Sequence, residues 1–302
     1  MIRTSLRSGR VLLGLAASLA LLAGCGGGER AKITNLEQMA NGEFAIPTGT
    51  VVDQLVNSKL PQAKFKYFNN VLDAAMAVKT GKADAAAYDE PILRNIAGKN
   101  PGLKVLPEPI TIDQYGYAVR LDDAALKTAI DEVVAAARAD GTYQQMMDRW
   151  LPKVGAPAAM PALPVGDGSG GVLRFGTAAT NEPFSFVDGS HQVVGMDAEF
   201  AARVAAKLNR KLEIVNMDFG AMIPALIAGK VDMIGACITI TEERKKSVLF
   251  SESYYTGGIS ALVREESCSD GLAWHRWTRC HAGRGGAFTC APPARTSPPD
   301  SS

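Results

Sequence analysis

One pattern occurs twice in this chain and narrows the folds open to it. Residues 77–87 read Ala-Val-Lys-Thr-Gly-Lys-Ala-Asp-Ala-Ala-Ala, and residues 225–235 read Ala-Leu-Ile-Ala-Gly-Lys-Val-Asp-Met-Ile-Gly. In each copy a helical segment ends at a glycine, and an apolar segment of strand length follows Gly-Lys-x-Asp. The repeat indicates two similar α/β lobes, although chance likeness of helix–glycine–strand junctions is the alternative. Small ligands commonly bind between lobes, so it also suggests where a site would lie.

Short strands and helices alternate on both sides of a linker. The 302 residues are 47% hydrophobic, which is ample for a core. The alternation covers residues 32–153 and 172–266, and residues 154–171 between them are rich in proline and glycine, as linkers are. Helices are expected over residues 51–60, 70–80, 122–139, 142–150, 197–208 and 221–228, and strands over 43–46, 64–68, 83–88, 104–106, 115–119, 172–177, 184–187, 212–215, 231–236, 250–255 and 259–263.

The first 25 residues have the features of an export signal. Three arginines precede an apolar stretch, residues 11–22, that is too short to span a bilayer comfortably. The stretch closes on Leu22-Ala-Gly-Cys25, which resembles the bacterial lipobox. That resemblance implies cleavage before Cys25, lipidation of its sulfur, a tether over residues 26–31 and a protein anchored outside the cytoplasmic membrane. An ordinary signal peptide with an incidental cysteine is the alternative.

The last 36 residues, 267–302, differ from the rest of the chain. They contain no lysine and no isoleucine but three of the five cysteines, and their polar residues follow no period. We expect this tail to be disordered, and out-of-frame reading of a GC-rich gene would produce such a composition. The spacing of Cys268, Cys280, His281 and Cys290 matches no close ligand pair of a zinc site. Neither a metal nor a cofactor is expected, and the net charge of +1 implies no nucleic-acid partner.

A threonine-rich loop, residues 235–244, has the chemistry to hold a carboxylate. It follows an apolar strand and leads into a helix start, where Thr241 is suited to cap the first turn. Backbone N–H groups at such a start, together with hydroxyls and the guanidinium of Arg244, are donors that carboxylates bind.

The motifs of this second half resemble those of the extracytoplasmic solute-binding proteins of family 3, the amino-acid receptors of ABC importers. They are Pro183-Phe184, Gly195-Met-Asp197, Phe219-Gly-Ala-Met-Ile-Pro-Ala-Leu, Gly229-Lys-Val-Asp-Met-Ile, Ile240-Thr-Glu-Glu-Arg244 and Phe250-Ser-Glu-Ser-Tyr-Tyr. Residues 172–266 resemble the first lobe of that family. Residues 32–153 resemble its second lobe through Gly49-Thr50, Gly81-Lys-Ala-Asp84, Tyr88-Asp89, Tyr115-Gly-Tyr-Ala-Val and Asp140-Gly-Thr-Tyr. The resemblance implies a two-lobed α/β fold of the periplasmic-binding-protein type II class.

The resemblance also implies a role for individual residues. Arg244 would bind the carboxylate of an amino acid, helped by Cys237, Ile238 and Thr239, and Asp89 would bind its ammonium group. Gly49 and Thr50 would add donors from across the cleft, and Asn181 and Phe184 would shape the side-chain pocket.

Each of these roles has a plainer alternative. Arg244 would be a solvated helix arginine paired with Glu243, and Asp89 a cap for the helix that follows it. Phe184 would belong to the core and Cys237 would be a small buried residue. Asp197 is expected to cap its helix rather than to touch ligand.

The order of the halves departs from the family, in which the first lobe precedes the second. The chain is either a remnant of a tandem receptor or a circular permutant with all parts of one cleft. On this order we expect one of the two hinge crossings to be missing, and hence a looser hinge and weaker ligand affinity than in an intact member.

The function implied is a lipid-anchored receptor that delivers an amino acid or similar zwitterion to an ABC importer, without catalysis. The alternatives are an enzyme similar to cyclohexadienyl dehydratases, a sensory module and a truncated, non-functional product.

Overall fold

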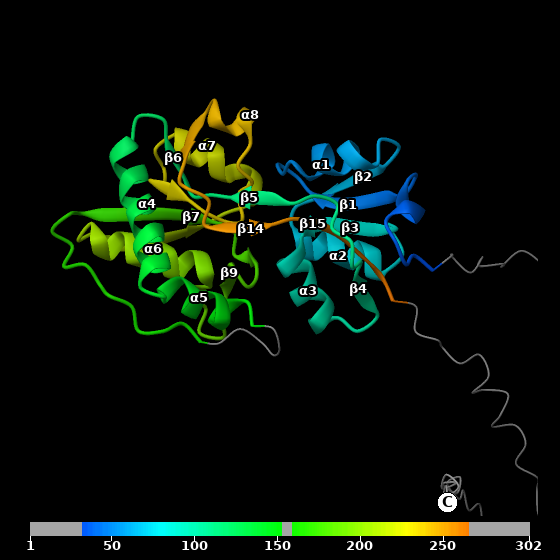
Figure 1. The fold of residues 1–302 in the computed structure, drawn as a ribbon, viewed down its shortest axis with the longest axis horizontal. Coiled ribbons are helices and arrows are strands. Elements are labelled where there is room, and N and C mark those ends of the chain that lie inside the picture. Colours follow the sequence, from blue (N-terminus) through cyan, green and yellow to red (C-terminus); the bar gives the residue numbers. More distant parts are fainter. Residues whose placement is uncertain (1–31, 153–158, 266–302) are drawn as a thin grey trace, which may run out of the picture. The chain divides into compact units, whose positions relative to one another are not determined.

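The computed structural model describes residues 32–152 and 159–265 (Figure 1). The predictions for the signal peptide, Cys25, the tether and the tail from residue 267 therefore lie outside the described residues. Within the described ranges, no helix is long and apolar enough to cross a membrane.

Five strands form one sheet in the order β2-β1-β3-β15-β4. They are β1 (Glu43–Pro47), β2 (Lys64–Phe68), β3 (Ala85–Asp89), β4 (Leu103–Val105) and β15 (Ile259–Arg264). Strands β2, β1 and β3 are parallel, whereas β15 is antiparallel to both of its neighbours. Helices α1 (Val52–Lys59), α2 (Val71–Lys79) and α3 (Glu90–Lys99) pack on this sheet, and we call this body the β1 lobe. Every residue of β3 is buried, as expected of a central strand covered on both faces.

A second sheet has the strand order β11-β7-β12-β6-β13. Its strands are β6 (Ala118–Arg120), β7 (Val172–Thr177), β11 (Lys211–Asn216), β12 (Met233–Ile234) and β13 (Val248–Phe250). Helices α4 (Ala124–Ala139), α5 (Thr142–Trp150), α6 (Met196–Lys207), α7 (Met222–Ile227) and α8 (Glu242–Lys245) complete what we call the β7 lobe. Shorter elements are η1 (Glu37–Met39), η2 (Phe219–Ala221) and the small sheet of β8 (Thr180–Asn181), β9 (Ser185–Val187) and β10 (Val193–Val194).

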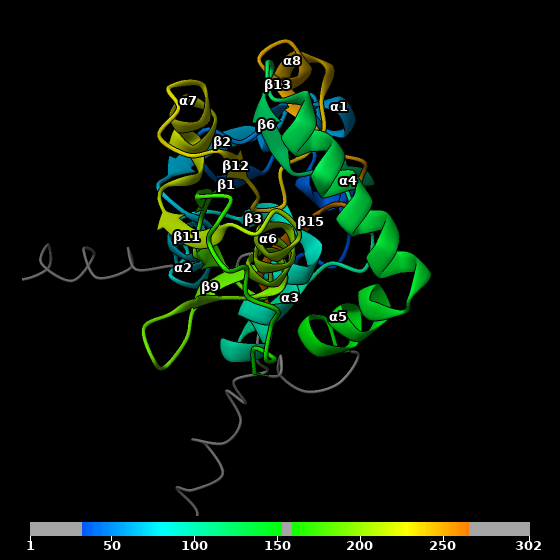
Figure 2. The ribbon, with the colours of Figure 1, turned by 90° about the vertical axis from the view of Figure 1, so that its left-hand side faces the viewer.

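Each half of the sequence contributes to both lobes. Strand β6, from the first half, pairs with β12 and β13 of the second half, and α4 lies beside α6 (Figures 1 and 2). In the other direction, β15 inserts between β3 and β4 of the first half. The expectation that the lobes would divide at the linker is therefore wrong, because strand pairing outside each half decides which lobe a segment joins.

Two strands cross between the lobes, side by side. Strand β5 (Asp113–Tyr115) pairs antiparallel with β14 (Tyr255–Gly257), and the rings of Tyr115 and Tyr255 stack with their centroids 5.8 Å apart. The prediction that one crossing would be missing is wrong, because residues 255–257 supply the second crossing before β15 joins the β1 lobe. The expected looser hinge loses its basis with it.

Most local predictions from the sequence are confirmed. The side chain of Asn70 accepts a hydrogen bond from the backbone N–H of Asp73 at 2.9 Å and so caps α2. Gly81 ends that helix with a φ of 75°. At α5 the N-cap is Gly141, because only a glycine readily adopts the left-handed conformation found there, with φ 81° and ψ −3°.

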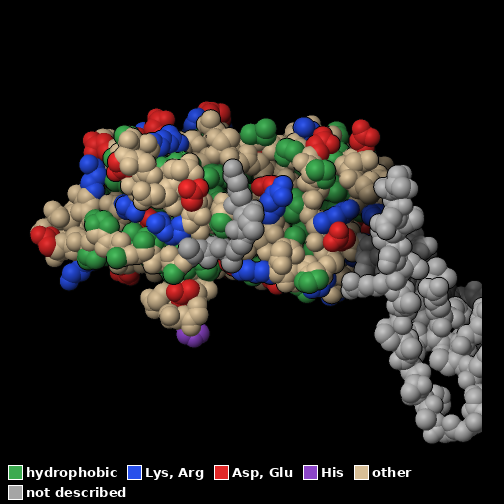
Figure 3. All heavy atoms as spheres, turned by 60° about the horizontal axis from the view of Figure 1, so that its bottom comes forward, with side chains coloured by type: hydrophobic (Ala, Val, Ile, Leu, Met, Phe, Trp, Pro, Cys, Tyr) green, Lys and Arg blue, Asp and Glu red, His purple; other side chains and the backbone are tan. Residues whose placement is uncertain are grey.

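Several segments differ from their expected extent. The strand expected over residues 250–255 is wrong, because β13 ends at Phe250 and β14 starts at Tyr255. The strand expected over residues 115–119 is divided, because β5 ends at Tyr115 and β6 starts at Ala118. The last part of the linker is packed rather than free: the backbone N–H of Gly170 donates to the carbonyl oxygen of Asn209 at 3.0 Å. On the face seen in Figure 3, acidic and basic side chains are interspersed, in keeping with the net charge of +1.

Candidate functional site

The loop predicted to hold a carboxylate is fixed to a crossing strand. The backbone N–H of Gly116 donates to the carbonyl oxygen of Ile238 at 3.1 Å, and that of Ile240 donates to Gln114 at 2.9 Å. Tyr115 and Thr239 form an antiparallel bridge between these two bonds. A loop from the second half of the chain is therefore held in place by a strand from the first half.

Arg244 is buried beside this loop, with 9% of its surface exposed. Its Nη1 donates to the carbonyl oxygen of Thr239 at 3.0 Å, and its guanidinium carbon lies 5.6 Å from the centroid of the Phe219 ring. It makes no ion pair within residues 32–152 and 159–265, and Glu243 pairs with Lys246 instead, so the alternative of a surface ion pair is wrong. Burial lowers the pKa of Arg244, although the nearby Asp89 acts in the other direction. The remaining donors of its planar fork are suited to a carboxylate from outside the chain.

Asp89 ends strand β3 in the opposite lobe and is 4% exposed. It occupies the N-cap position of α3, but its side chain makes no cap hydrogen bond, so the capping interpretation is wrong. Its Oδ1 is buried and has no hydrogen-bond partner within the described chain. Burial raises the pKa of Asp89 to about 7, while Tyr115 and the charge of Arg244 act to lower it. A buried carboxylate in this state gains stability from a cation that binds beside it.

Contacts across the cleft bring the two lobes together around these residues. The side-chain amide of Asn181, in the β7 lobe, donates to the hydroxyl of Tyr88, in the β1 lobe, at 3.2 Å. On one flank Lys99 forms an ion pair with Glu182 across the cleft. On the other flank the backbones approach closely, since a Cβ on Gly49 would lie 2.5 Å from the Cα of Gly220.

The structure gives several of the predicted site residues other roles. Phe184 is fully buried and packs edge-on against Tyr255 with ring centroids 5.3 Å apart, so it is a core residue and not a pocket wall. The hydroxyl of Thr50 donates to the carbonyl oxygen of Pro47 at 2.9 Å and is thereby occupied in its own turn. Asp197 is buried and accepts a hydrogen bond from the Tyr117 hydroxyl at 3.1 Å, which replaces the expected helix cap.

Three further residues of the loop are buried. Cys237 is 2% exposed with a φ of 55°, and burial raises the pKa of its thiol, as expected of a small packed residue and not of a reactive one. Ile238 is 1% exposed and belongs to the core of the β7 lobe. Thr239 is 7% exposed and contributes its carbonyl oxygen to Arg244.

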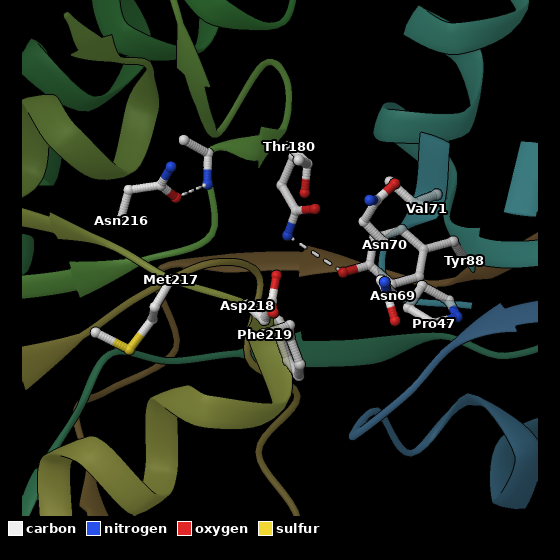
Figure 4. A pocket seen from close by; sticks show the side chains of 12 residues that line it. Pro47, Asn69, Asn70, Val71, Tyr88, Thr180, Asn216, Met217, Asp218 and Phe219 are labelled. Carbon is white, nitrogen blue, oxygen red and sulfur yellow. Dashed lines mark hydrogen bonds between the residues drawn. The ribbon is translucent and has the colours of Figure 1, made fainter. Parts of the chain in front are cut away.

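A cavity of about 330 Å³ opens between the lobes, and its lining includes Tyr88, which precedes Asp89, and Phe219, which contacts Arg244. Figure 4 shows Thr180, Asp218 and Phe219 on one side of it and Asn69, Asn70 and Tyr88 on the other. It is lined by Pro47, Asn69, Asn70, Val71, Tyr88, Ala179, Thr180, Asn181, Asn216, Met217, Asp218 and Phe219.

Asn181 is the predicted site residue that lines this cavity. The sequence reasoning missed the rest of the lining, although a signal was present. Tyr88 lies near the carboxyl end of β3, and Asp218 and Phe219 follow the carboxyl end of β11. In α/β sheets, ligands bind outside the carboxyl ends of the strands.

Residues 173–271 match the family model of the bacterial extracellular solute-binding proteins, family 3. This part of the chain is similar to that family. Among the curated proteins, the chain is similar to the arginine-binding extracellular protein ArtP of Bacillus subtilis, 38% identical over 32% of this chain and 37% of ArtP. The glutamine-binding protein GlnH of the same organism is 29% identical over 40% of this chain and 44% of its own length.

Among solved structures, the chain is similar to part of an arginine-binding protein. The arginine-bound domain 1 of TmArgBP is 40% identical over 34% of this chain and 87% of that domain, with a TM-score of 0.28. The chain spans less than half the length of the two curated relatives, and both relatives are named as binding proteins.

Within the described residues, no group of three or more His, Cys, Asp or Glu side chains is placed to hold a metal ion.

Proposed function

We propose that this chain is an extracytoplasmic receptor that binds an amino acid, or a similar small zwitterion, between its lobes and delivers it to an ABC importer. The observation that carries the proposal is the pair of buried charges facing one cleft from opposite lobes. Arg244 has no carboxylate partner and Asp89 has a carboxylate oxygen without a partner, within the part of the chain that the structure describes. An α-carboxylate and an α-ammonium group are the complement of this pair.

The same pair explains why ligand would favour a closed arrangement of the lobes. Each charge belongs to a different lobe, so a zwitterion binds both charges only when the lobes close on it. Each charge-assisted hydrogen bond contributes about 1.5–3 kcal/mol, and exclusion of water by closure is needed for micromolar binding. Strands β5 and β14 are the two chain crossings about which such a closure would occur.

Several parts of the proposal rest on the sequence. Cys25 would carry the lipid that anchors the protein to the outer face of the cell envelope, and an ABC permease would be the partner that accepts the ligand. We propose that the permuted halves work as one receptor, which the pairing of β6 and β15 with strands of the other half supports. No catalysis is part of the proposal, and an assay with prephenate or arogenate tests that point.

A thermal-shift screen of the full-length chain against the amino acids tests the proposed function. At least one amino acid should raise the melting temperature, by an amount that grows with ligand concentration. Its α-amide and its N-acetyl derivative, which lack the carboxylate and the ammonium group respectively, should have little effect. If no amino acid raises the melting temperature, or if the N-acetyl derivative is as effective as the free amino acid, the proposed site is wrong.

The pH dependence of binding should follow the titration of Asp89. Its pKa is raised to about 7 in the ligand-free protein, so below this pH a proton must leave before the ligand's ammonium group can bind. The dissociation constant should therefore rise about tenfold for each pH unit below 7 and change little between pH 7.5 and 8.5. Calorimetric titrations from pH 5 to 8.5 measure this, and Asp89→Asn should give weaker binding without the slope.

Asp197 offers a matched control, because its pKa is also raised to about 7 and its side chain is buried away from the cavity. Asp197→Asn should keep the slope. A flat profile in the unsubstituted protein would contradict the role of Asp89. In the absence of ligand, the stability of the fold changes with pH in the opposite direction. The two carboxyl groups ionise at a lower pH in the unfolded chain than in the folded one, so the stability that their neutral forms contribute is lost as the pH rises from about 4 to 7.

A further inference from the structure

We propose that Asp218 selects an amino acid whose side chain carries a positive charge. This inference rests on the proposed function, because it assumes that the α-carboxylate and α-ammonium groups bind at Arg244 and Asp89. It assigns the neighbouring cavity to the ligand's side chain.

Two residues that line the cavity are also neighbours of Arg244 and Asp89. Phe219 lines the cavity and also lies under the guanidinium of Arg244. Tyr88 lines the cavity and directly precedes Asp89 in β3. Asn181, which bonds to Tyr88, lies in the same wall. A ligand bound to Arg244 and Asp89 would thus extend its side chain past Phe219 and Tyr88 into this space.

Among the described residues that line the cavity, the only charged side chain is negative. Of the twelve lining residues, Asp218 is the one with a carboxylate, and none is a lysine, arginine or histidine. Burial raises the pKa of Tyr88 well above its ordinary value, so its hydroxyl stays neutral. Asp218 makes no ion pair with any residue that the structure describes, and although it is the N-cap of η2, its side chain makes no cap hydrogen bond. Its carboxylate is therefore available to a ligand.

The other polar groups of the lining are partly occupied. The Oδ1 of Asn70 accepts from the backbone of Asp73, and the Oδ1 of Asn216 accepts from the backbone of Ala179. Neither amide carries a charge that would neutralise Asp218. When the lobes close, water is excluded from the cavity, and a carboxylate that loses water is favoured by a cationic partner, tolerates a neutral one poorly and repels an anion.

A pair of ligands with the same shape and different charge tests this inference. Arginine and citrulline differ in the replacement of a guanidinium by a neutral ureido group. Calorimetry on the full-length chain should show arginine binding at least about tenfold more tightly than citrulline, since a charge-assisted bond is lost. Asp218→Asn should bring this ratio close to one by weakening arginine, and Asp218→Glu should keep the preference for arginine.

The control is Glu108→Gln, which removes an exposed carboxylate outside the cavity and should leave the ratio unchanged. Equal affinity of the unsubstituted chain for arginine and citrulline, or an unchanged ratio in Asp218→Asn, would overturn the role of Asp218 while leaving an amino-acid receptor in place. Failure of every amino acid to bind would overturn the proposed function itself. Circular-dichroism spectra of the substituted chains should match that of the unsubstituted chain. A changed ratio of arginine to citrulline affinity then reflects the site and not the fold.

Discussion

Replacement of Arg244 by alanine should weaken amino-acid binding between about 30-fold and about 3,000-fold. Truncating one partner of a buried, hydrogen-bonded charge pair costs about 2–5 kcal/mol, and each 1.4 kcal/mol, roughly, is a factor of ten in the dissociation constant. The loss should appear for every amino acid that binds, because the α-carboxylate is common to them. Calorimetric titration of the variant against the best ligand measures it.

The stability of the ligand-free variant should change little. Arg244 has no ion pair in the described chain, and its contact with the Phe219 ring is worth about 0.5–1 kcal/mol. Arg244→Lys should recover a part of the affinity, because lysine keeps the charge and loses the planar fork. Binding that survives Arg244→Ala within a factor of about three would place the carboxylate elsewhere.

Arg138 provides the matched control for this experiment. Its guanidinium carbon lies 5.4 Å from the centroid of the Tyr143 ring, and its Nη2 donates to the carbonyl oxygen of Ser253 at 2.7 Å. It thus has the same kinds of contact as Arg244, but it is exposed and makes them elsewhere in the chain. Arg138→Ala should bind ligand as the unsubstituted chain does.

Replacement of Glu199 by alanine should destabilise the fold by about 3–5 kcal/mol, the range expected when a buried charge loses its partner. Glu199, on α6, is fully buried. Its Oε2 accepts from Arg149 and from the Trp150 indole, both at 2.7 Å, and its Oε1 accepts from Arg203 at 2.6 Å. The substitution would leave these donors without their acceptor. Urea denaturation followed by circular dichroism measures the change in the free energy of unfolding.

This network also joins the two halves of the sequence. Arg149 and Trp150 lie in α5, before the linker, and Glu199 and Arg203 lie in α6, after it. An exposed ion pair between Lys207 and Glu132, 2.7 Å apart, connects α6 to α4 and serves as the control. Glu132→Ala should cost less than about 1 kcal/mol, because the pair is solvated. Equal effects of the two substitutions would show that the halves are not held together through the buried network.

Local rules in the sequence predicted most helices and strands. The cap at Asn70 and the glycine stop at Gly81 depend on neighbours within a few residues, so they are readable from the sequence. Arg244 and Asp89 were singled out as a ligand-binding pair through the resemblance to a known family rather than through a local rule. Within the described chain Arg244 makes no ion pair and the Oδ1 of Asp89 has no hydrogen-bond partner, and this was visible only in the structure.

The residues that were misjudged depend on distant parts of the chain. Phe184 is a core residue because Tyr255, far along the sequence, packs against it. Asp197 is held by Tyr117 of the other half rather than by its own helix start. Tyr88 and Asp218 meet at one cavity because two separate sheets end there. No local pattern contains these contacts.

The sequence by itself determined the α/β class, the repeated helix–strand unit, most of the elements and the donor groups of the threonine-rich loop. The tertiary structure alone decided which lobe each segment joins and how many strands cross between the lobes. The physical reason is that a strand's hydrogen bonds are made with neighbours that are remote in sequence. Strands β6 and β15 look like any other short apolar strands, and only their pairing with β12 and β3 makes two permuted halves into two sheets that share one cleft.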